Sequence, residues 1–157
     1  MIMPKETTLL LVDDRPENLL ALEGVLEDLG YTIVKATSGQ EALRTVLKQQ
    51  IDLILLDVQM PGMDGFEVAK LLHGKAETRE IPIIFITANS KEQQYIYKGY
   101  ECGAENYLFK PIDPDVLRAK VKESLKYHQY RQQMAAHTQR MELRHQPQGE
   151  PGTAPKR

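Results

Sequence analysis

The chain has 157 residues, a length typical of one domain that buries its core without disulfides or metals. Its 20 basic and 22 acidic residues leave a net charge of −2, which argues against nucleic-acid binding through overall charge. One cysteine excludes an intrachain disulfide. The apolar stretch 9–12 is too short for a signal peptide or a membrane span. We therefore predict a soluble cytoplasmic protein with neither a nucleic-acid nor a membrane partner.

Short apolar runs alternate with amphipathic segments from residue 9 to about residue 125. The runs are typical of strands buried on both faces, and they lie at 9–12, 31–36, 53–56, 83–86 and 107–109. The amphipathic segments predict helices at 16–29, 38–48, 66–72, 90–103 and from 114 onward. Five strands alternating with five helices indicate an α/β fold with a parallel sheet covered on both faces.

Local signals mark where several of these helices begin and end. Pro16 suits the first turn of a helix, and Gly30 suits the residue just past its end. Ser38, followed by Glu41 three residues later, forms a capping-box pattern. Asp113 is expected to cap the last helix, which opens at Pro114.

Polar residues follow four of the predicted strands at the point where each strand ends. They are Asp13, Asp14, Asp57, Thr87 and Lys110. Parallel strands place these ends at one edge of the sheet, where ligands bind in open α/β folds. Three close carboxylates repel one another and favour a cation, and hard oxygen ligands suit Mg²⁺. One such carboxylate can also attack phosphorus, with a lysine and a hydroxyl stabilising the phosphoryl oxygens.

Four motifs at these strand ends resemble the receiver domain of two-component response regulators. The motifs are Val12-Asp13-Asp14, Leu56-Asp57-Val58-Gln59-Met60-Pro61-Gly62-Met63-Asp64-Gly65, Ile86-Thr87-Ala88 and Phe109-Lys110-Pro111. The resemblance covers about residues 7–126. It implies a doubly wound, flavodoxin-like sheet of five parallel strands in the order 2-1-3-4-5.

The resemblance also implies a role for each strand-end residue. Asp57 would accept a phosphoryl group from the phosphohistidine of a kinase. Mg²⁺ would be held by Asp13, Asp14, Asp57 and the backbone carbonyl of Gln59. Lys110 would pair with a phosphoryl oxygen.

The remaining implied roles concern the switch. Thr87 would move to bond the phosphoryl group, and Tyr107 would turn inward when it does. The Lys110–Pro111 peptide bond would be cis, which costs little before proline. Gln59 and Asn89 match positions that tune phosphorylation and dephosphorylation rates. Such a protein is a signalling switch and not a metabolic enzyme.

Each of these residues also has a simpler structural interpretation. An acidic pair after a strand can cap a helix, a threonine can simply favour the strand, and a tyrosine can be core packing. Two rival functions use related chemistry or the same fold. A phosphohydrolase would need an acid two residues after Asp57, where Gln59 stands. A flavodoxin would need a phosphate-binding loop where Asp13 and Asp14 stand. A signalling-dead adaptor stays a third alternative.

The sequence predicts three segments: a receiver domain at 1–126, a helical extension at 127–145 and a disordered, Pro- and Gly-rich tail at 146–157. Within the extension, Tyr127, Met134 and Met141 recur every seven residues. This spacing is compatible with a weak coiled coil, which would join two receivers or lead to an output domain, and with a frayed polar helix.

The resemblance implies a histidine kinase or phosphotransfer protein as the phosphoryl donor. Downstream, it implies a partner protein or a fused output domain. A homodimer would use the face made by the fourth helix, fifth strand and fifth helix, or the C-terminal helix. Tyr95, Tyr97 and Tyr100 on the fourth predicted helix suit either an interface or packing. A receiver cut from a hybrid kinase or a cyclic-di-nucleotide regulator is a further alternative.

Overall fold

The computed structural model describes residues 6–88 and 106–145. The predicted helix at 90–103, with its three tyrosines, Asn89 and Cys102, lies outside the described residues, as does the tail 146–157. The chain divides into two compact units, residues 1–125 and residues 126–157. Each unit is described by itself below.

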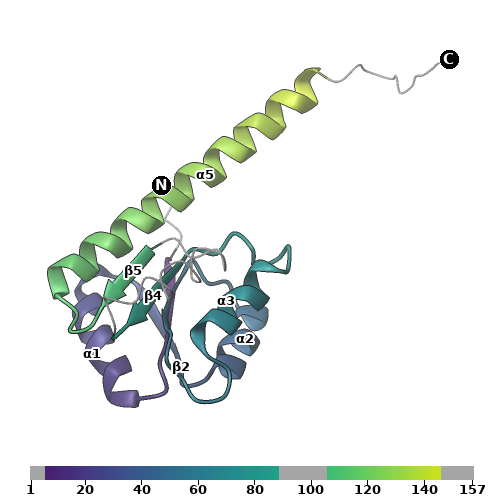
Figure 1. Cartoon of the computed structure of the whole chain (residues 1–157). Coiled ribbons are helices and arrows are strands. Elements are labelled where there is room, and N and C mark those ends of the chain that lie inside the picture. Colours follow the sequence, from purple (N-terminus) through teal and green to yellow (C-terminus); the bar gives the residue numbers. More distant parts are fainter. Residues whose placement is uncertain (1–5, 89–105, 146–157) are drawn as a thin grey trace. The chain divides into compact units, whose positions relative to one another are not determined.

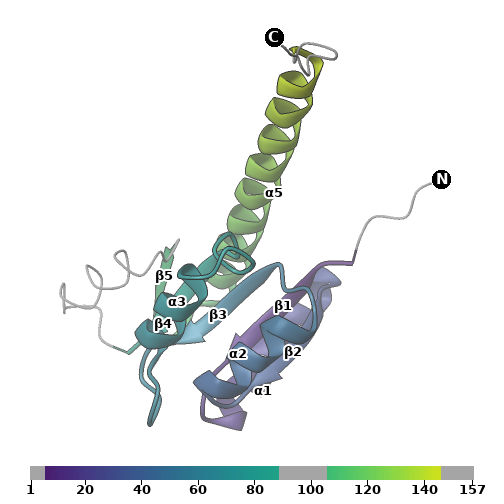
Figure 2. The same ribbon diagram turned by 90° about the vertical axis from the view of Figure 1, so that its right-hand side faces the viewer.

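Five parallel strands form the sheet of the first unit (Figures 1 and 2). The strands are β1 (Thr8–Val12), β2 (Thr32–Ala36), β3 (Leu53–Asp57), β4 (Ile83–Thr87) and β5 (Asn106–Phe109). Their order across the sheet is β2-β1-β3-β4-β5. The predicted α/β fold and the strand order implied by the resemblance are both confirmed.

Helices cover both faces of the sheet (Figures 1 and 2). The described helices are α1 (Pro16–Leu26), a 3-10 turn (Glu27–Leu29), α2 (Gly39–Lys48), α3 (Gly65–His73) and α5 (Pro114–His145). Alternation along β1 assigns side chains to the two faces. Leu10 and Val12 pack in the cluster with α2 and α3, while Leu9 and Leu11 pack in the cluster with α1 and the start of α5. All four side chains are fully buried, so the strands are fixed in register.

Helix caps explain most of the helix boundaries. The Ser38 hydroxyl accepts a bond from the Glu41 N–H at 3.1 Å, as its capping pattern predicts. Asp64 and Glu67 form a complete capping box that starts α3 at Gly65, one residue before the prediction. Helix α1 ends at Leu26 instead of continuing to Leu29. The chain tightens there into a 3-10 turn, which Gly30 ends in the left-handed conformation with φ 79°.

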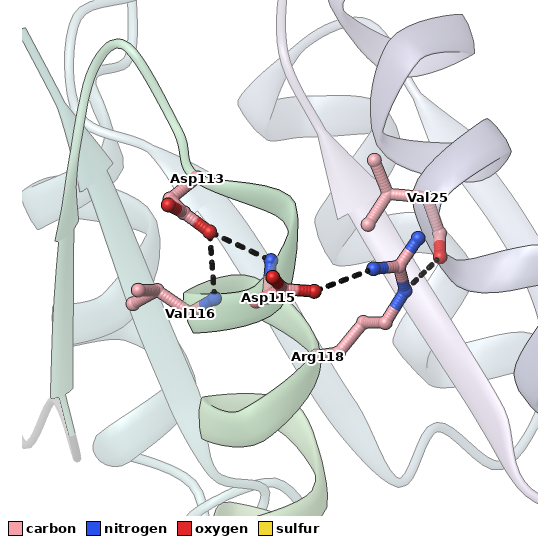
Figure 3. A network of polar contacts seen from close by, with 5 residues as sticks. All are labelled: Val25, Asp113, Asp115, Val116 and Arg118. Atoms are coloured by element: carbon pink, nitrogen blue, oxygen red, sulfur yellow. Dashed lines mark hydrogen bonds and ion pairs between the residues drawn. The ribbon is translucent and has the colours of Figure 1, made fainter.

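A polar network ties the start of α5 to the end of α1 (Figure 3). The Arg118 Nε donates to the Val25 carbonyl at 3.1 Å, and the Arg118 guanidinium also bonds Asp115 at 3.1 Å. Asp113 caps α5 by accepting the N–H groups of Asp115 and Val116. The predicted cap is confirmed. The network also anchors the first turns of α5, which begins four residues after Lys110, to the end of α1.

The second unit contains the continuation of α5 from Lys126 to His145. The expected extension of the last helix is therefore present. Among the helices in the described parts of the chain, none combines the length and the apolar character that crossing a membrane requires.

Candidate functional site

The candidate site lies at the carboxyl edge of the sheet. Asp13 and Asp14 follow β1, Asp57 and Thr87 end β3 and β4, and Lys110 follows β5. Backbone bonds continue past the strand ends: the Lys110 N–H donates to the Thr87 carbonyl at 2.9 Å. The parallel sheet therefore brings together residues that are up to 97 positions apart in sequence, from Asp13 to Lys110.

Three carboxylates form the centre of this edge. Asp13, Asp14 and Asp57 each offer a carboxylate oxygen, and these oxygens lie within 4.8 Å of one another. Asp13 and Asp57 are 2% and 3% exposed, whereas Asp14 is partly exposed. Hard oxygen donors at this spacing are the ligand set that Mg²⁺ prefers. The residues present therefore fit a divalent cation.

Lys110 provides the positive charge nearest to two of these carboxylates. Its Nζ lies 3.5 Å from Asp57 Oδ1 and 3.9 Å from Asp13 Oδ2. One ammonium shared by two buried carboxylates leaves the cluster with an excess of negative charge. A cation or another positively charged group would relieve this excess.

The environment of Asp57 changes its acidity. Burial, reinforced by the nearby Asp13 carboxylate, raises the pKa of Asp57 from 3.8 to about 6. Lys110 and a hydrogen bond from the Gln59 backbone oppose this rise. Asp57 is therefore mostly ionised at neutral pH, in the form that can attack phosphorus.

Asp13 is held in place by the first turn of α1. Its Oδ1 accepts the Arg15 N–H at 2.9 Å, and its Oδ2 accepts the Asn18 side-chain amide at 3.1 Å. Asp13 does not cap α1, whose N-cap is Arg15 without a side-chain cap bond, so its two bonds orient the carboxylate within the cluster. Asn18 was missed by the sequence analysis. An asparagine five residues after a strand-end aspartate, in the first turn of the next helix, was the available signal.

A pocket of about 350 Å³ opens over the cluster. Its lining residues are Asp13, Asp14, Arg15, Asn18, Asp57, Gln59, Ala88 and Lys110. Gln59 and Ala88 are exposed. The pocket is therefore accessible from outside the molecule and large enough for a phosphoryl group.

Thr87 and Tyr107 do not line this pocket, and both are buried, at 1% and 6% exposed. The Tyr107 ring packs between aromatic neighbours, 5.5 Å from the ring of Phe85 and stacked 6.3 Å from that of Phe109. The inward position of Tyr107 is thus the one present in this structure. The Lys110–Pro111 peptide bond is cis.

Comparison with known proteins identifies the family. Residues 9–122 match the response regulator receiver domain. The chain is 35% identical to protein PilH of Pseudomonas aeruginosa over 109 residues, which cover 69% of this chain and 89% of PilH. It is 39% identical to sensor protein EvgS of Escherichia coli K12 over 121 residues, which cover 77% of this chain. The chain spans only 10% of the length of EvgS.

Solved structures give the same result. A putative response regulator from Chloroflexus aurantiacus is 38% identical with a TM-score of 0.74, and the match covers 78% of this chain and 99% of that one. The chemotaxis protein CheY4 of Vibrio cholerae is 30% identical with a TM-score of 0.72, covering 76% and 99%. The chain therefore belongs to the response regulator receiver domain family, whose members are phosphoacceptor signalling switches that bind Mg²⁺ at an acidic cluster.

Proposed function

We propose that Asp57 is the residue of this receiver that accepts the phosphoryl group. The observation that carries the proposal is the position of its buried carboxylate. It lies 3.5 Å from the Lys110 ammonium, beside two further carboxylates, in the lining of an open pocket. Asp13 is equally buried and lies 3.9 Å from the same ammonium, but both of its carboxylate oxygens already accept hydrogen bonds, from the Arg15 N–H and the Asn18 amide.

The transfer is a displacement at phosphorus. An ionised oxygen of Asp57 attacks the phosphoryl group, a P–O bond forms, and the P–N bond to the histidine of the donor breaks. Lys110 pairs with one phosphoryl oxygen and lowers the cost of the charge that gathers on it. The Thr87 hydroxyl donates to another phosphoryl oxygen after a short movement toward the pocket.

A divalent cation would be held by Asp13, Asp14, Asp57 and the backbone carbonyl of Gln59. Asn18 and the Arg15 N–H hold the Asp13 carboxylate in a fixed orientation for this role. Mg²⁺ supplies neutralisation of the phosphoryl oxygens when it is bound. The buried carboxylates of Asp13 and Asp57 keep their separation because both are attached to central strands of the sheet.

Phosphorylation shifts an equilibrium between two arrangements of Thr87 and Tyr107. When Thr87 bonds the phosphoryl group, its movement favours the inward position of Tyr107, which packs on Phe85 and Phe109. The change in Tyr107 alters the surface that β5 and α5 help to form, and a partner protein binds this surface. Chemistry at Asp57 thus controls a surface for protein contacts, and the chain is a switch instead of a metabolic enzyme.

The donor is a histidine kinase or a phosphotransfer protein, and the output is a downstream protein or an attached domain. An attached output domain is supported by relatives that are longer than this chain. The chain spans 26% of the response regulator PleD of Caulobacter vibrioides and 26% of a probable cyclic di-GMP phosphodiesterase of Vibrio cholerae. Homodimerisation stays a prediction.

The test is intact-mass spectrometry after incubation with acetyl phosphate and Mg²⁺. The wild-type chain should gain one phosphoryl group, while Asp57→Asn, a change of similar shape, should gain none. Chelation of divalent cations should abolish the gain. A folded wild-type chain that gains nothing from acetyl phosphate or from a histidine kinase would instead be a signalling-dead adaptor.

A further inference from the structure

The second unit presents an apolar stripe along one side of its helix. Tyr127, Tyr130, Met134 and Met141 are 55%, 59%, 46% and 41% exposed. The first, third and fourth of these are seven residues apart, and Tyr130 follows Tyr127 by three. These are the a and d positions of a heptad repeat, so the four side chains share one helix face. We name them the extension stripe.

The composition of the extension stripe is that of a protein interface. Tyrosine, methionine and arginine are enriched where proteins meet, and methionine adapts its shape to a partner. The Arg131 guanidinium lies 5.0 Å from the ring centroid of Tyr127. This cation–π contact holds a positive charge at the edge of the stripe, beside its largest exposed rings.

The charges that flank the stripe have one sign. Lys126 and Arg131 occupy the g and e positions beside Tyr127 and Tyr130. The sequence holds no acidic residue between Glu123 and Glu142. A partner with acidic residues at its own flanking positions would therefore form opposite-charge pairs along this part of the helix.

A second copy of the chain is a poorer occupant. A parallel pairing of two identical helices would place Lys126 of one copy against Arg131 of the other. His137 stands at the d position between Tyr130 and Met141, and a polar residue there weakens a symmetric seam.

We propose that the extension stripe binds an amphipathic helix with acidic flanks that belongs to a different protein. Its apolar residues bury the stripe, and its carboxylates pair with Lys126 and Arg131. This interaction goes beyond the phosphoryl chemistry, because every residue in it belongs to the second unit.

The probes are two fluorescently labelled synthetic peptides of three heptads, both with leucine at a and d. One carries glutamate at e and g, and the other carries lysine there. Anisotropy titration with the full chain should show binding of the glutamate peptide, weakened by added salt, and none of the lysine peptide. Equal binding of the two peptides would overturn the proposal.

Two variants with the same charge change locate the contact. Met134→Asp places a carboxylate in the stripe, whereas Gln132→Asp places one on the opposite side of the helix. Binding of the glutamate peptide should weaken by at least about tenfold in the first, because a buried anchor is lost. It should change little in the second. Equal loss in both variants would contradict a contact through the stripe.

Two further measurements separate the other occupants. Sedimentation of the full chain alone should show a monomer. Self-association that is lost in Met134→Asp would overturn the proposal, because the stripe would then bind a second copy of the chain. The protein should not co-sediment with vesicles of phosphatidylcholine and phosphatidylglycerol. Co-sedimentation would show that the stripe binds a lipid surface and would overturn the proposal. Both variants should still accept a phosphoryl group from acetyl phosphate, so failure here is distinguishable from failure at Asp57.

Discussion

Gly65 lies so close to the backbone of Asp57 that no other residue fits there without movement. A Cβ on Gly65 would overlap the Asp57 carbonyl oxygen and stand 2.9 Å from the Cα of Val58. The Gly65 N–H donates to the Val58 carbonyl at 2.9 Å. The start of α3 is therefore packed directly against the strand end that carries the proposed phosphoacceptor.

Gly65→Ala should push α3 away from the end of β3. We expect a loss of about 1–3 kcal/mol in the free energy of unfolding, because backbone atoms cannot move aside as a flexible side chain can. Phosphorylation by acetyl phosphate should also slow. Gly24→Ala is the matched control, since a Cβ on this residue near the end of α1 meets nothing within 4 Å. Urea denaturation should show the control unchanged or slightly more stable; equal destabilisation of both would contradict this account.

Asp57→Asn should stabilise the fold at neutral pH in the absence of divalent cations. The pKa of Asp57 is raised to about 6 in the folded chain, against 3.8 as its ordinary value. The protonated form thus favours folding below pH 3.8, and this contribution is lost as pH rises through 6. We expect a gain of about 1–2 kcal/mol at pH 7, reduced from the full shift because the pocket admits water.

Denaturation across pH provides the check on Asp57→Asn. The difference between the variant and wild type should shrink as the pH falls from 7 to below 4. Mg²⁺ should also reduce the difference at pH 7, because only the wild-type carboxylate binds it well. A difference in the free energy of unfolding that does not depend on pH would show that the charge of Asp57 does not destabilise the fold.

Lys110→Met should raise the pKa of Asp57 further. The ammonium, 3.5 Å from Asp57 Oδ1, lowers this pKa in the wild type, and methionine keeps much of the side-chain volume without the charge. Titration of the Asp57 carboxyl carbon by NMR, without divalent cations, would measure the change. Lys35→Met is the control, because Lys35 pairs with Glu23 and not with the cluster. An unchanged midpoint of the Asp57 titration in Lys110→Met would show that Lys110 does not influence the charge of Asp57.

Thr87→Ala should leave phosphorylation of Asp57 intact and weaken its effect on Tyr107. In the proposed switch the Thr87 hydroxyl bonds the phosphoryl group, whereas the proposed nucleophile and cation ligands are other residues. Tyr107 ring signals in NMR spectra, recorded before and after phosphorylation, should move less in Thr87→Ala than in wild type. Thr87→Ser, which keeps the hydroxyl, should respond as wild type does. An identical response in the alanine variant would contradict the switch.

Most of the fold follows from local sequence signals. The runs at Leu9–Val12 and Leu53–Leu56 predict strands because every residue in them is apolar, as burial on both faces requires. Strand order came from the resemblance, since spacing alone does not say which strands pair. The early end of α1 was missed because the tightening into a 3-10 turn depends on tertiary contacts, among them the Arg118 bond to Val25.

The residues of the site were only partly predictable from the sequence. Sheet topology places strand ends together, so the convergence of Asp13, Asp57 and Lys110 follows from their positions after apolar runs. The support of Asp13 by Asn18 depends on side-chain geometry that spacing does not specify. The steric demand at Gly65 likewise arises from a backbone approach between segments. From the sequence alone, Gly65 was only the last residue of a motif and Asn18 was not singled out.

The most direct measurement is identification of the phosphorylated residue. The chain is phosphorylated with acetyl phosphate and Mg²⁺, treated with borohydride to reduce the acyl phosphate to an alcohol, digested and sequenced by mass spectrometry. We expect homoserine at position 57 and unchanged aspartate at positions 13 and 14. Reduction at either of those two positions, or at another residue while Asp57 stays intact, would contradict this expectation.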